Sequence, residues 1–441
     1  MKRLFGTLLL LLVVISVSCK NPKYIFYFIG DGMGPSHVLG TELYLGEQQG
    51  VIGTPHRLCF TQFPHTAFVT TYSASNGVTD SAASGTALAT GSKTKNGRIG
   101  VDTNGENVYS IAHNAKDAGM AVGIATTVCI NHATPSAFYA HNISRNNYNE
   151  IAQWMLTADY DFYAGGDAKC NDKQREELYS KACNNGYTIA RGYNDYLAKA
   201  DNSNKIMLYQ EEVAEVIPYT IDRTPDDLTL AQITEAGIDF LYDKKKEGFF
   251  IMIEGGKIDY ASHSDDVATV FHEVLDFNAA IGVAYEFYKK HKEETVIIVT
   301  ADHETGGLVL GYKGDYSLNL KELEKQQVSV DRLKEILLAQ QETTWGEIDK
   351  IVKENIGIAT RSSKPADESV AITPDLANKI AWDAIYDINR KAAISWASGN
   401  HSGAYVPLFA IGKGAEKFHG VIDNTDIPKI IRSMIGFKNN K

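Results

Sequence analysis

The sequence predicts an α/β fold, a three-layer sandwich whose mostly parallel central sheet has helices on both faces. Strand and helix patterns alternate along the chain, as in βαβ units. The apolar runs at residues 24–29, 248–253 and 295–300 are nearly continuous, which is typical of strands that are buried on both sides. Each of these runs leads into a carboxylate, at the edge where parallel sheets place their ligands.

The other elements continue this pattern. A further strand is predicted at residues 121–127, and a last one at residues 405–411. Helical periodicity is found at residues 108–116, 148–156, 228–241, 266–290 and 427–435. Together these elements account for one large domain, which we expect to comprise residues 19–441.

Residues 311–398 differ in composition from the rest of this domain. They are rich in Lys, Glu, Gln and Leu, with helix-like runs at residues 330–340 and 345–355. Thr373-Pro374 then supplies an N-cap followed by proline in the first turn, which is a typical helix start. We therefore predict a helical insertion at residues 311–398, with mixed charges that indicate a solvated face.

The amino terminus has the pattern of a cleaved export signal. Two basic residues precede an apolar core at residues 8–15, and the small residues Ser16 and Ser18 lead into Cys19. The core is too short to span a membrane. We expect residues 1–18 to be removed, and the protein to be exported to the periplasm or cell envelope with a lipid anchor at Cys19. Plain secretion is the alternative.

The charge of the chain limits its partners. With a formal net charge of −11, the protein is not expected to bind nucleic acid specifically, and it would repel an anionic substrate at long range. An anion site would therefore need local positive charge, from metal ions or from a few basic side chains.

Four cysteines follow Cys19, and export would permit their oxidation. Cys170 and Cys183 flank a short polar stretch, so we expect these two to form a disulfide. None of the cysteines has the spacing of zinc ligands.

Ser81 is a candidate nucleophile. It lies in a run of small residues, 78–90, where it would open a helix, and the free N–H groups and dipole of a helix N-terminus favour a phosphate or an attacking oxygen. Taken alone, the run fits an ordinary N-cap at Thr79-Asp80-Ser81 better, followed by small residues that permit close packing.

Candidate metal ligands follow the three apolar strands. Asp31 comes directly after the first strand, between glycines, and Asp302-His303 follows the third. The second strand leads into Glu254, and Asp259 and His263 follow at an i, i+4 spacing that would put both on one face of a helix, a usual arrangement for two zinc ligands. Asp-Gly turns, structural acids and a capping histidine are the alternatives.

Three loops add weaker candidates. His401 lies in a Gly/Ser-rich loop before the last strand, and His132 and Thr134 lie in a polar loop after the strand at residues 121–127. Arg145 could hold a phosphate with the two-point fork of its guanidinium, although a surface salt bridge is an equally simple reading.

Taken together and in order, these segments resemble the alkaline phosphatase family. The resemblance extends from about residue 24 to residue 419, and residues 311–398 are its least matched part. It is carried by Gly30-Asp31-Gly32-Met33-Gly34, Thr79-Asp80-Ser81-Ala82-Ala83-Ser84, His132-Ala133-Thr134-Pro135, Arg145, Glu254 to His263, Thr300-Ala301-Asp302-His303 and His401. Each motif is weak by itself, but the ordered set is highly specific.

The resemblance implies roles for the residues that would act on the substrate. Ser81 would be the nucleophile that forms a phosphoserine, Arg145 would clamp the phosphate oxygens, and Asp80 would orient Arg145. His132 and Tyr260 lie next to metal ligands at positions where the family varies, and would tune phosphate release and the identity of one of the metal ions.

The resemblance also implies two zinc ions and a third ion, usually Mg²⁺. The implied ligand sets are Asp259, His263 and His401 for one zinc, Asp31, Asp302 and His303 beside Ser81 for the second, and Asp31, Thr134 and Glu254 for the third ion.

The implied activity is hydrolysis of small phosphate monoesters to an alcohol and inorganic phosphate, by a homodimer. The insertion would shape access to the site or contribute to the dimer surface. A phosphodiesterase or sulfatase of the same superfold is the alternative. The sequence has no Cys-x-Pro-x-Arg signature of sulfatases, and Ser81 and Arg145 favour a monoester over a diester. A non-catalytic lipoprotein that binds phosphate is a third possibility, which would require a missing ligand.

Overall fold

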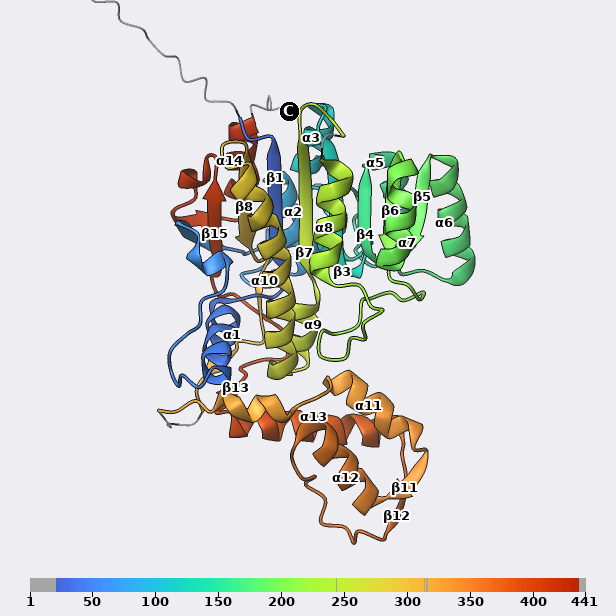
Figure 1. Cartoon of the computed structure of the whole chain (residues 1–441), viewed down its shortest axis with the longest axis vertical. Helices are drawn as coiled ribbons and strands as arrows, with labels where there is room; N and C mark the ends of the chain where they lie inside the picture. Colours follow the sequence, from blue (N-terminus) through green and yellow to red (C-terminus); the bar gives the residue numbers. More distant parts are fainter. Residues whose placement is uncertain (1–20, 243, 313, 315, 436–441) are drawn as a thin grey trace, which may run out of the picture.

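The structure is a computed structural model that describes residues 21–435, except residues 243, 313 and 315. The predicted export signal at residues 1–18 and the lipidation site Cys19 lie outside the described residues, so both stay predictions. Figure 1 shows a broad twisted sheet with helices in front of it and behind it, and a group of helices beyond one end of its strands.

The central sheet has ten strands, which confirms the predicted fold class. Neighbouring strands are parallel except at β15, which runs antiparallel to both of its neighbours. From one edge to the other the order is β16 (Gly420–Asp423), β2 (His65–Thr70), β15 (Val406–Gly412), β8 (Thr295–Thr300), β1 (Tyr24–Gly30), β7 (Phe249–Gly255), β3 (Ala121–Cys129), β4 (Phe162–Gly166), β6 (Lys205–Tyr209) and β5 (Tyr187–Arg191).

Helices cover both faces of this sheet (Figure 1). The sheet layers and their connections contain α1 (Pro35–Gln48), α2 (Ser81–Thr90), α3 (Ile111–Asp117), α4 (Ala133–Ser136), α5 (Tyr148–Ala158), α6 (Asp172–Asn184), α7 (Gly192–Lys199), α8 (Leu230–Leu241), α9 (Lys257–His263), α10 (Val267–Lys290) and α14 (Asp426–Ile435). The helix predicted from residue 108 begins only at Ile111, because the side chain of Ser110 accepts a hydrogen bond from His113 N and caps it.

The core lies at the centre of the sheet. Every residue of β1, β7 and β8 is buried, as their continuous apolar runs predict. Helix α10 is long and apolar enough to span a membrane by composition, but most of it is buried against α8 and these three strands. Its apolar character is therefore that of a core helix.

Short strands tie the loops at the carboxyl ends of the central strands. Antiparallel pairs join β9 (Glu304–Thr305) to β14 (His401–Ser402), and β10 (Val309–Leu310) to β13 (Ile394–Ser395). The segment between β10 and β13 contains the short 3₁₀ helix η3 (Leu320–Lys325), the helices α11 (Val330–Ala339), α12 (Trp345–Ile356) and α13 (Pro374–Lys391), and an antiparallel pair formed by β11 (Glu342–Thr344) and β12 (Ser369–Ala371).

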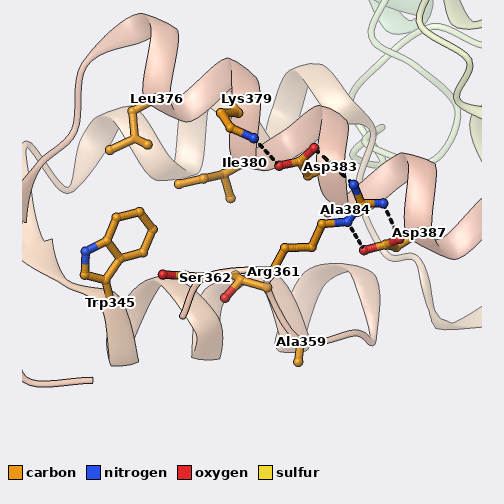
Figure 2. Close-up of a pocket in the computed structure, with 11 residues that line it drawn as sticks. Trp345, Ala359, Arg361, Ser362, Leu376, Lys379, Ile380, Asp383, Ala384 and Asp387 are labelled. Carbon is orange, nitrogen blue, oxygen red and sulfur yellow. Dashed lines mark hydrogen bonds and ion pairs between the residues drawn. The ribbon is translucent and has the colours of Figure 1, made fainter. Parts of the chain in front are cut away.

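These helices carry the segment for which an insertion is predicted. Thr373 caps α13 through a hydrogen bond from Leu376 N, as the Thr-Pro pattern indicates. Figure 2 shows a small pocket between α13 and the chain at residues 359–362, where Arg361 forms ion pairs with Asp383 and Asp387. The charged groups at this pocket are thus satisfied by one another.

The expected Cys170–Cys183 disulfide is wrong. Both thiols are free, and Cys170 Sγ donates a hydrogen bond to Ala168 O. Cys170 precedes α6 and Cys183 lies near the C-terminal end of that helix. About a dozen helical residues at a rise of ~1.5 Å each place the two Cα atoms far beyond the ~7 Å that a disulfide can bridge.

A buried ion pair fixes the loop before α8 against α10. Arg223 and Asp276 are each 7% exposed, and two parallel bonds of 3.0 Å join the guanidinium to the carboxylate. We expect Asp276→Ala to lower the free energy of unfolding by roughly 3–5 kcal/mol, because it leaves the Arg223 charge buried and unpaired. Denaturant unfolding measures this change.

The matched control is the double variant Arg223→Met/Asp276→Leu, which removes both charges and should recover most of the lost stability. A loss below about 1 kcal/mol for Asp276→Ala would show that water reaches Arg223 and that this pair is not effectively buried.

Candidate active site and metal centres

The carboxylates that follow β1, β7 and β8 converge because these strands are adjacent and parallel. In the sheet, Ile29 of β1 is paired with Glu254 on one side and with Thr300 on the other. Asp31 lies just beyond this row and donates its backbone N–H to Gly255 O. Asp302 lies at the same level and accepts a hydrogen bond from Gly32 N. The sheet itself therefore brings carboxylates from three strands to one place.

A first group of metal-type ligands consists of Asp259, His263 and His401. Asp259 and His263 lie one turn apart on α9, with His263 Nε2 3.4 Å from Asp259 Oδ2, which confirms their shared helix face. His401 Nε2 approaches Asp259 Oδ1 at 3.6 Å from β14. The other ring nitrogens donate to backbone carbonyls, His263 Nδ1 to Gly399 O and His401 Nδ1 to Thr79 O, which leaves both Nε2 atoms available as ligands.

A second group consists of Asp31, Asp302 and His303. His303 Nε2 lies 3.2 Å from Asp31 Oδ1 and 3.3 Å from Asp302 Oδ2, and all three side chains are fully buried. Ser81 Oγ lies 3.1 Å from the same ring nitrogen. The hydroxyl of the candidate nucleophile therefore borders this group.

A third group shares Asp31 and adds Glu254 and His132. The sequence analysis assigns Thr134 to this ion instead of His132. Thr134 lies in α4, close by, and its hydroxyl donates to Asp302 Oδ2 at 3.3 Å. Thr134 is thus close to Asp302, and His132 is close to Asp31 and Glu254. His132 offers a nitrogen ligand, although the sequence predicts it only as a neighbour of the ligands.

The carboxyl groups of the second and third groups hold protons unusually strongly. Burial, together with repulsion from neighbouring carboxylates, raises the pKa of Asp302 to about 7 and that of Glu254 to about 8. The same causes raise the pKa of Asp31 well above its ordinary value. The pKa of His303 is lowered well below its ordinary value by burial and by the charge of His401, so that its ring is neutral.

In the first group, Asp259 and His263 favour each other's charged forms. The hydrogen bond to Asp259 raises the pKa of His263 to about 9. Burial opposes ionisation of Asp259, but the hydrogen bond from His263 and the nearby histidines outweigh it and lower the pKa of Asp259. Without a cation, a proton on His263 thus balances the Asp259 charge.

These residues fit metal ions. The ligand atoms within each group lie within 4.8 Å of one another. Several of them are buried with no hydrogen-bond partner, namely both carboxylate oxygens of Asp31, Glu254 Oε1 and His132 Nδ1. Buried polar atoms without partners cost free energy, and buried carboxylates are normally paired with cations. Carboxylate oxygens and imidazole nitrogens are ligands that Zn²⁺ accepts.

The N-terminus of α2 and the guanidinium of Arg145 lie on the opposite side of Ser81. Ser81 is the first residue of α2, and Asp80 caps this helix by accepting from Ala83 N at 2.9 Å. The other oxygen of Asp80 accepts from Arg145 Nη1 at 3.1 Å, and Arg145 Nη2 lies 3.1 Å from His132 Nε2. Arg145 is therefore held beside the N-terminus of α2, not in a surface salt bridge remote from the site.

Tyr260 lies at the edge of this arrangement. It is in α9 directly after Asp259, and its ring centroid is 5.8 Å from that of His132. Its predicted role in tuning phosphate release and the identity of one metal ion stays a prediction.

Sequence reasoning missed two threonines that hold the ligands. Thr305 Oγ1 donates to Asp259 Oδ1 at 2.5 Å and lies 3.2 Å from His303 Nδ1, so it links the first group to the second. Thr126, on β3, donates to Glu254. Thr305 lies only two residues after His303, and this closeness was the available signal. Thr126 gave none, because it is one of two adjacent threonines in a buried strand.

Comparison with known proteins identifies the family. The sequence model of the family described as alkaline phosphatase matches residues 22–161 and 166–437. Alkaline phosphatase 4 of Bacillus subtilis (strain 168) is 32% identical over 419 residues, which cover 93% of this chain and 88% of that relative. Alkaline phosphatase 3 of the same organism is 32% identical over 420 residues, covering 92% and 87%.

Solved structures agree. A cold-active alkaline phosphatase from a psychrophilic Shewanella species superposes with a TM-score of 0.81 at 31% identity, over 93% of this chain and 99% of that one. The alkaline phosphatase of the Antarctic bacterium TAB5 superposes with a TM-score of 0.70 at 29% identity, over 95% and 100%. With its sequence matched over nearly the whole length and its fold shared with these enzymes, the chain belongs to the alkaline phosphatase family.

Proposed function

We propose that the protein hydrolyses phosphate monoesters to an alcohol and inorganic phosphate through a phosphoserine formed on Ser81. As a member of the alkaline phosphatase family it is a phosphoric monoester hydrolase. The proposal concerns the residues and ions that carry the reaction. Its main support is the position of Ser81 Oγ, which lies at the start of α2, 3.1 Å from His303 Nε2 in a group of buried metal-type ligands.

The proposed ions are two zincs and a third ion. Bound there, they would supply the positive charge that stabilises the attacking and leaving oxygens and the Lewis acidity that activates water. The proposed ligands are Asp259, His263 and His401 for the first zinc, Asp31, Asp302 and His303 for the second, and Asp31, Glu254 and Thr134 for the third ion, with His132 in reach of it.

The side chains of the protein have separate tasks in this mechanism. Ser81 Oγ attacks phosphorus, in line with the leaving oxygen. His303 is neutral, which suits its Nε2 for binding a cation beside that hydroxyl. Arg145 presents two N–H groups to the non-bridging oxygens, where the transferred phosphoryl group is most negative. Asp80 holds the guanidinium in this orientation.

We propose Mg²⁺ for the third ion, although the nearby His132 makes the site less selective for Mg²⁺. Mg²⁺ favours oxygen ligands, which Asp31, Glu254 and Thr134 supply, whereas an imidazole nitrogen suits Zn²⁺ better. A variant of the TAB5 enzyme in which a histidine is replaced by glutamate has Mg bound in a site named M3. That observation on a relative supports a link between an oxygen ligand and Mg²⁺.

The first test compares three aryl substrates at alkaline pH: a phosphate monoester, the matching phosphate diester and the matching sulfate. We expect the monoester to be hydrolysed fastest, because a dianionic phosphate uses both Arg145 and the cations. A strong chelator should abolish turnover, and zinc should restore it. Faster hydrolysis of the diester or the sulfate would assign the protein to another activity of the same superfold.

Zinc restoration should depend on pH. His263 has a pKa of about 9 without metal, so below this pH zinc must displace its proton. The apparent zinc affinity of the first site should therefore rise as the pH increases, by up to about tenfold per pH unit for one displaced proton, and should level off near pH 9. Affinity that is independent of pH from 7 to 9 would mean that His263 is not a ligand.

Ser81→Ala should prevent formation of a phosphoenzyme and lower kcat by roughly a thousandfold or more, as for other nucleophiles. Metal content should remain at the wild-type value, because the imidazoles and carboxylates are intact. Acid quenching with a labelled substrate measures the phosphoenzyme, and Ser92→Ala, just beyond α2, is the matched control. A labelled serine in Ser81→Ala would disprove the assigned nucleophile.

We also propose that two copies of the chain pair through one end of the sheet. Leu39, Phe68, Tyr405 and Val421 are 43–63% exposed there, and Phe68 lies beside Val421 across the β2–β16 pair. Leu39 and Phe68 also line a pocket at this surface. Contiguous exposed apolar side chains mark interfaces.

Light scattering should give twice the chain mass for the wild type, and Phe68→Glu should give the monomer. A wild-type monomer would contradict the pairing.

A further inference from the structure

The turn that links α9 to α10 directly follows His263. His263 is the last residue of α9, and the chain reverses through residues 264–266 into α10. Asp265 has a φ of 52°, a left-handed conformation that non-glycine residues seldom adopt, and Asp266 caps α10. Such a turn persists only where its surroundings hold it, so its contacts matter for the ligand beside it.

Those contacts come from the helical segment between β10 and β13. Asn389 Nδ2, on α13, donates to Asp265 O at 2.6 Å. Gln326 Nε2 donates to Asp266 Oδ1 at 2.7 Å, and Val330 N, at the start of α11, donates to Asp266 Oδ2 at 2.8 Å. Asn389, Gln326 and Asp266 are at most 4% exposed. Two parts of the segment thus form buried hydrogen bonds with the turn.

The chain that leaves this segment holds the ring of His263 itself. Ala397 N and Ser398 N both donate to Gly306 O, at 3.0 and 3.1 Å, which anchors the segment's end beside β9. The next residue, Gly399, accepts the hydrogen bond from His263 Nδ1 at 2.8 Å. In Figure 1, α11 and α13 accordingly lie beyond the end of the strands where α9 follows β7.

The amides of Asn389 and Gln326 are not explained by packing. Asn389 Oδ1 and Gln326 Oε1 are buried without hydrogen-bond partners. Each unpaired oxygen costs free energy, which an apolar side chain of similar size would avoid. The amide of Asn389 contributes an N–H donor to the turn after His263, and the amide of Gln326 donates both to this turn and to Val328 O.

We propose that this helical segment positions the metal ligand His263, with Asn389 as the principal positioning residue. Asn389 touches neither substrate nor metal. It fixes the Asp265 carbonyl, and with it the direction in which the last turn of α9 presents the imidazole to Asp259 and His401. The inference rests on the proposed function in one respect, namely that Asp259, His263 and His401 bind zinc.

The test uses Asn389→Leu, which keeps the side-chain volume and removes the donor. The matched control is Asn378→Leu, which is on the exposed side of the same helix. Competition with a chelator at fixed pH measures zinc affinity on the metal-free full-length proteins. We expect Asn389→Leu to weaken zinc binding at the site of Asp259, His263 and His401 by about 10–100-fold, as when other partners of metal ligands are removed. Asn378→Leu should match the wild type.

Two further readouts separate positioning from general destabilisation. The melting temperature of metal-free Asn389→Leu should stay close to that of the metal-free wild type, because the loss of the hydrogen bond to Asp265 O is offset by removal of the unpaired Asn389 Oδ1. Its kcat should fall at limiting zinc and return to the wild-type value at excess zinc. A merely structural defect would lower the melting temperature and would not be rescued by zinc.

If Asn389→Leu does not fold, Gln326→Met, which removes the donor to Asp266, serves the same purpose, with the same expected loss of zinc affinity. Zinc affinity within twofold of the wild type in the folded variant would overturn the inference. The wild type is measured in parallel: failure of the wild type to bind zinc would overturn the proposed metal mechanism, whereas wild-type binding with an unchanged variant would overturn the positioning role alone.

Discussion

The main physical constraint on this structure is the repulsion between carboxylates that its central sheet places side by side. Three adjacent parallel strands end at the same edge, so Asp31, Glu254 and Asp302 are buried side by side. Their raised pKa values express this repulsion, and atoms of Asp31 and Glu254 have no hydrogen-bond partner. Such a cluster is stable only when neutralised, by protons or by cations. The fold thus creates the need that metal ions would meet.

The same constraint explains how an acidic protein handles an anionic substrate. The chain carries a net charge of −11, so its long-range field repels phosphate. At the candidate site, Arg145 supplies positive charge: Asp80 holds it beside the N-terminus of α2, and the ligand groups lie on the other side of Ser81. Local charge at short range outweighs the net charge, because the interaction of nearby charges in a buried site is weakly screened.

The helical segment between β10 and β13 acquires a function from its position. Its outer pocket holds charges that satisfy one another. Its inner side instead supplies N–H donors to the turn after His263, through Asn389 and Gln326. A segment that differs in composition from the rest of the chain thus contacts the turn that follows His263.

Much of this was determined by the sequence alone. Apolar runs identify the central strands, and their parallel order brings Asp31, Glu254 and Asp302 together, because carboxyl ends of parallel neighbours share an edge. The i, i+4 spacing of Asp259 and His263 likewise follows from helix geometry. Local periodicity cannot say which distant loops meet. Only the tertiary structure therefore decided that Thr305 bridges two ligand groups, that His132 joins Asp31, and that Asn389 reaches the turn after His263. It also decided that Cys183 lies at the far end of α6 from Cys170. Those contacts depend on how loops and helices pack at long range, and no sequence period encodes that packing.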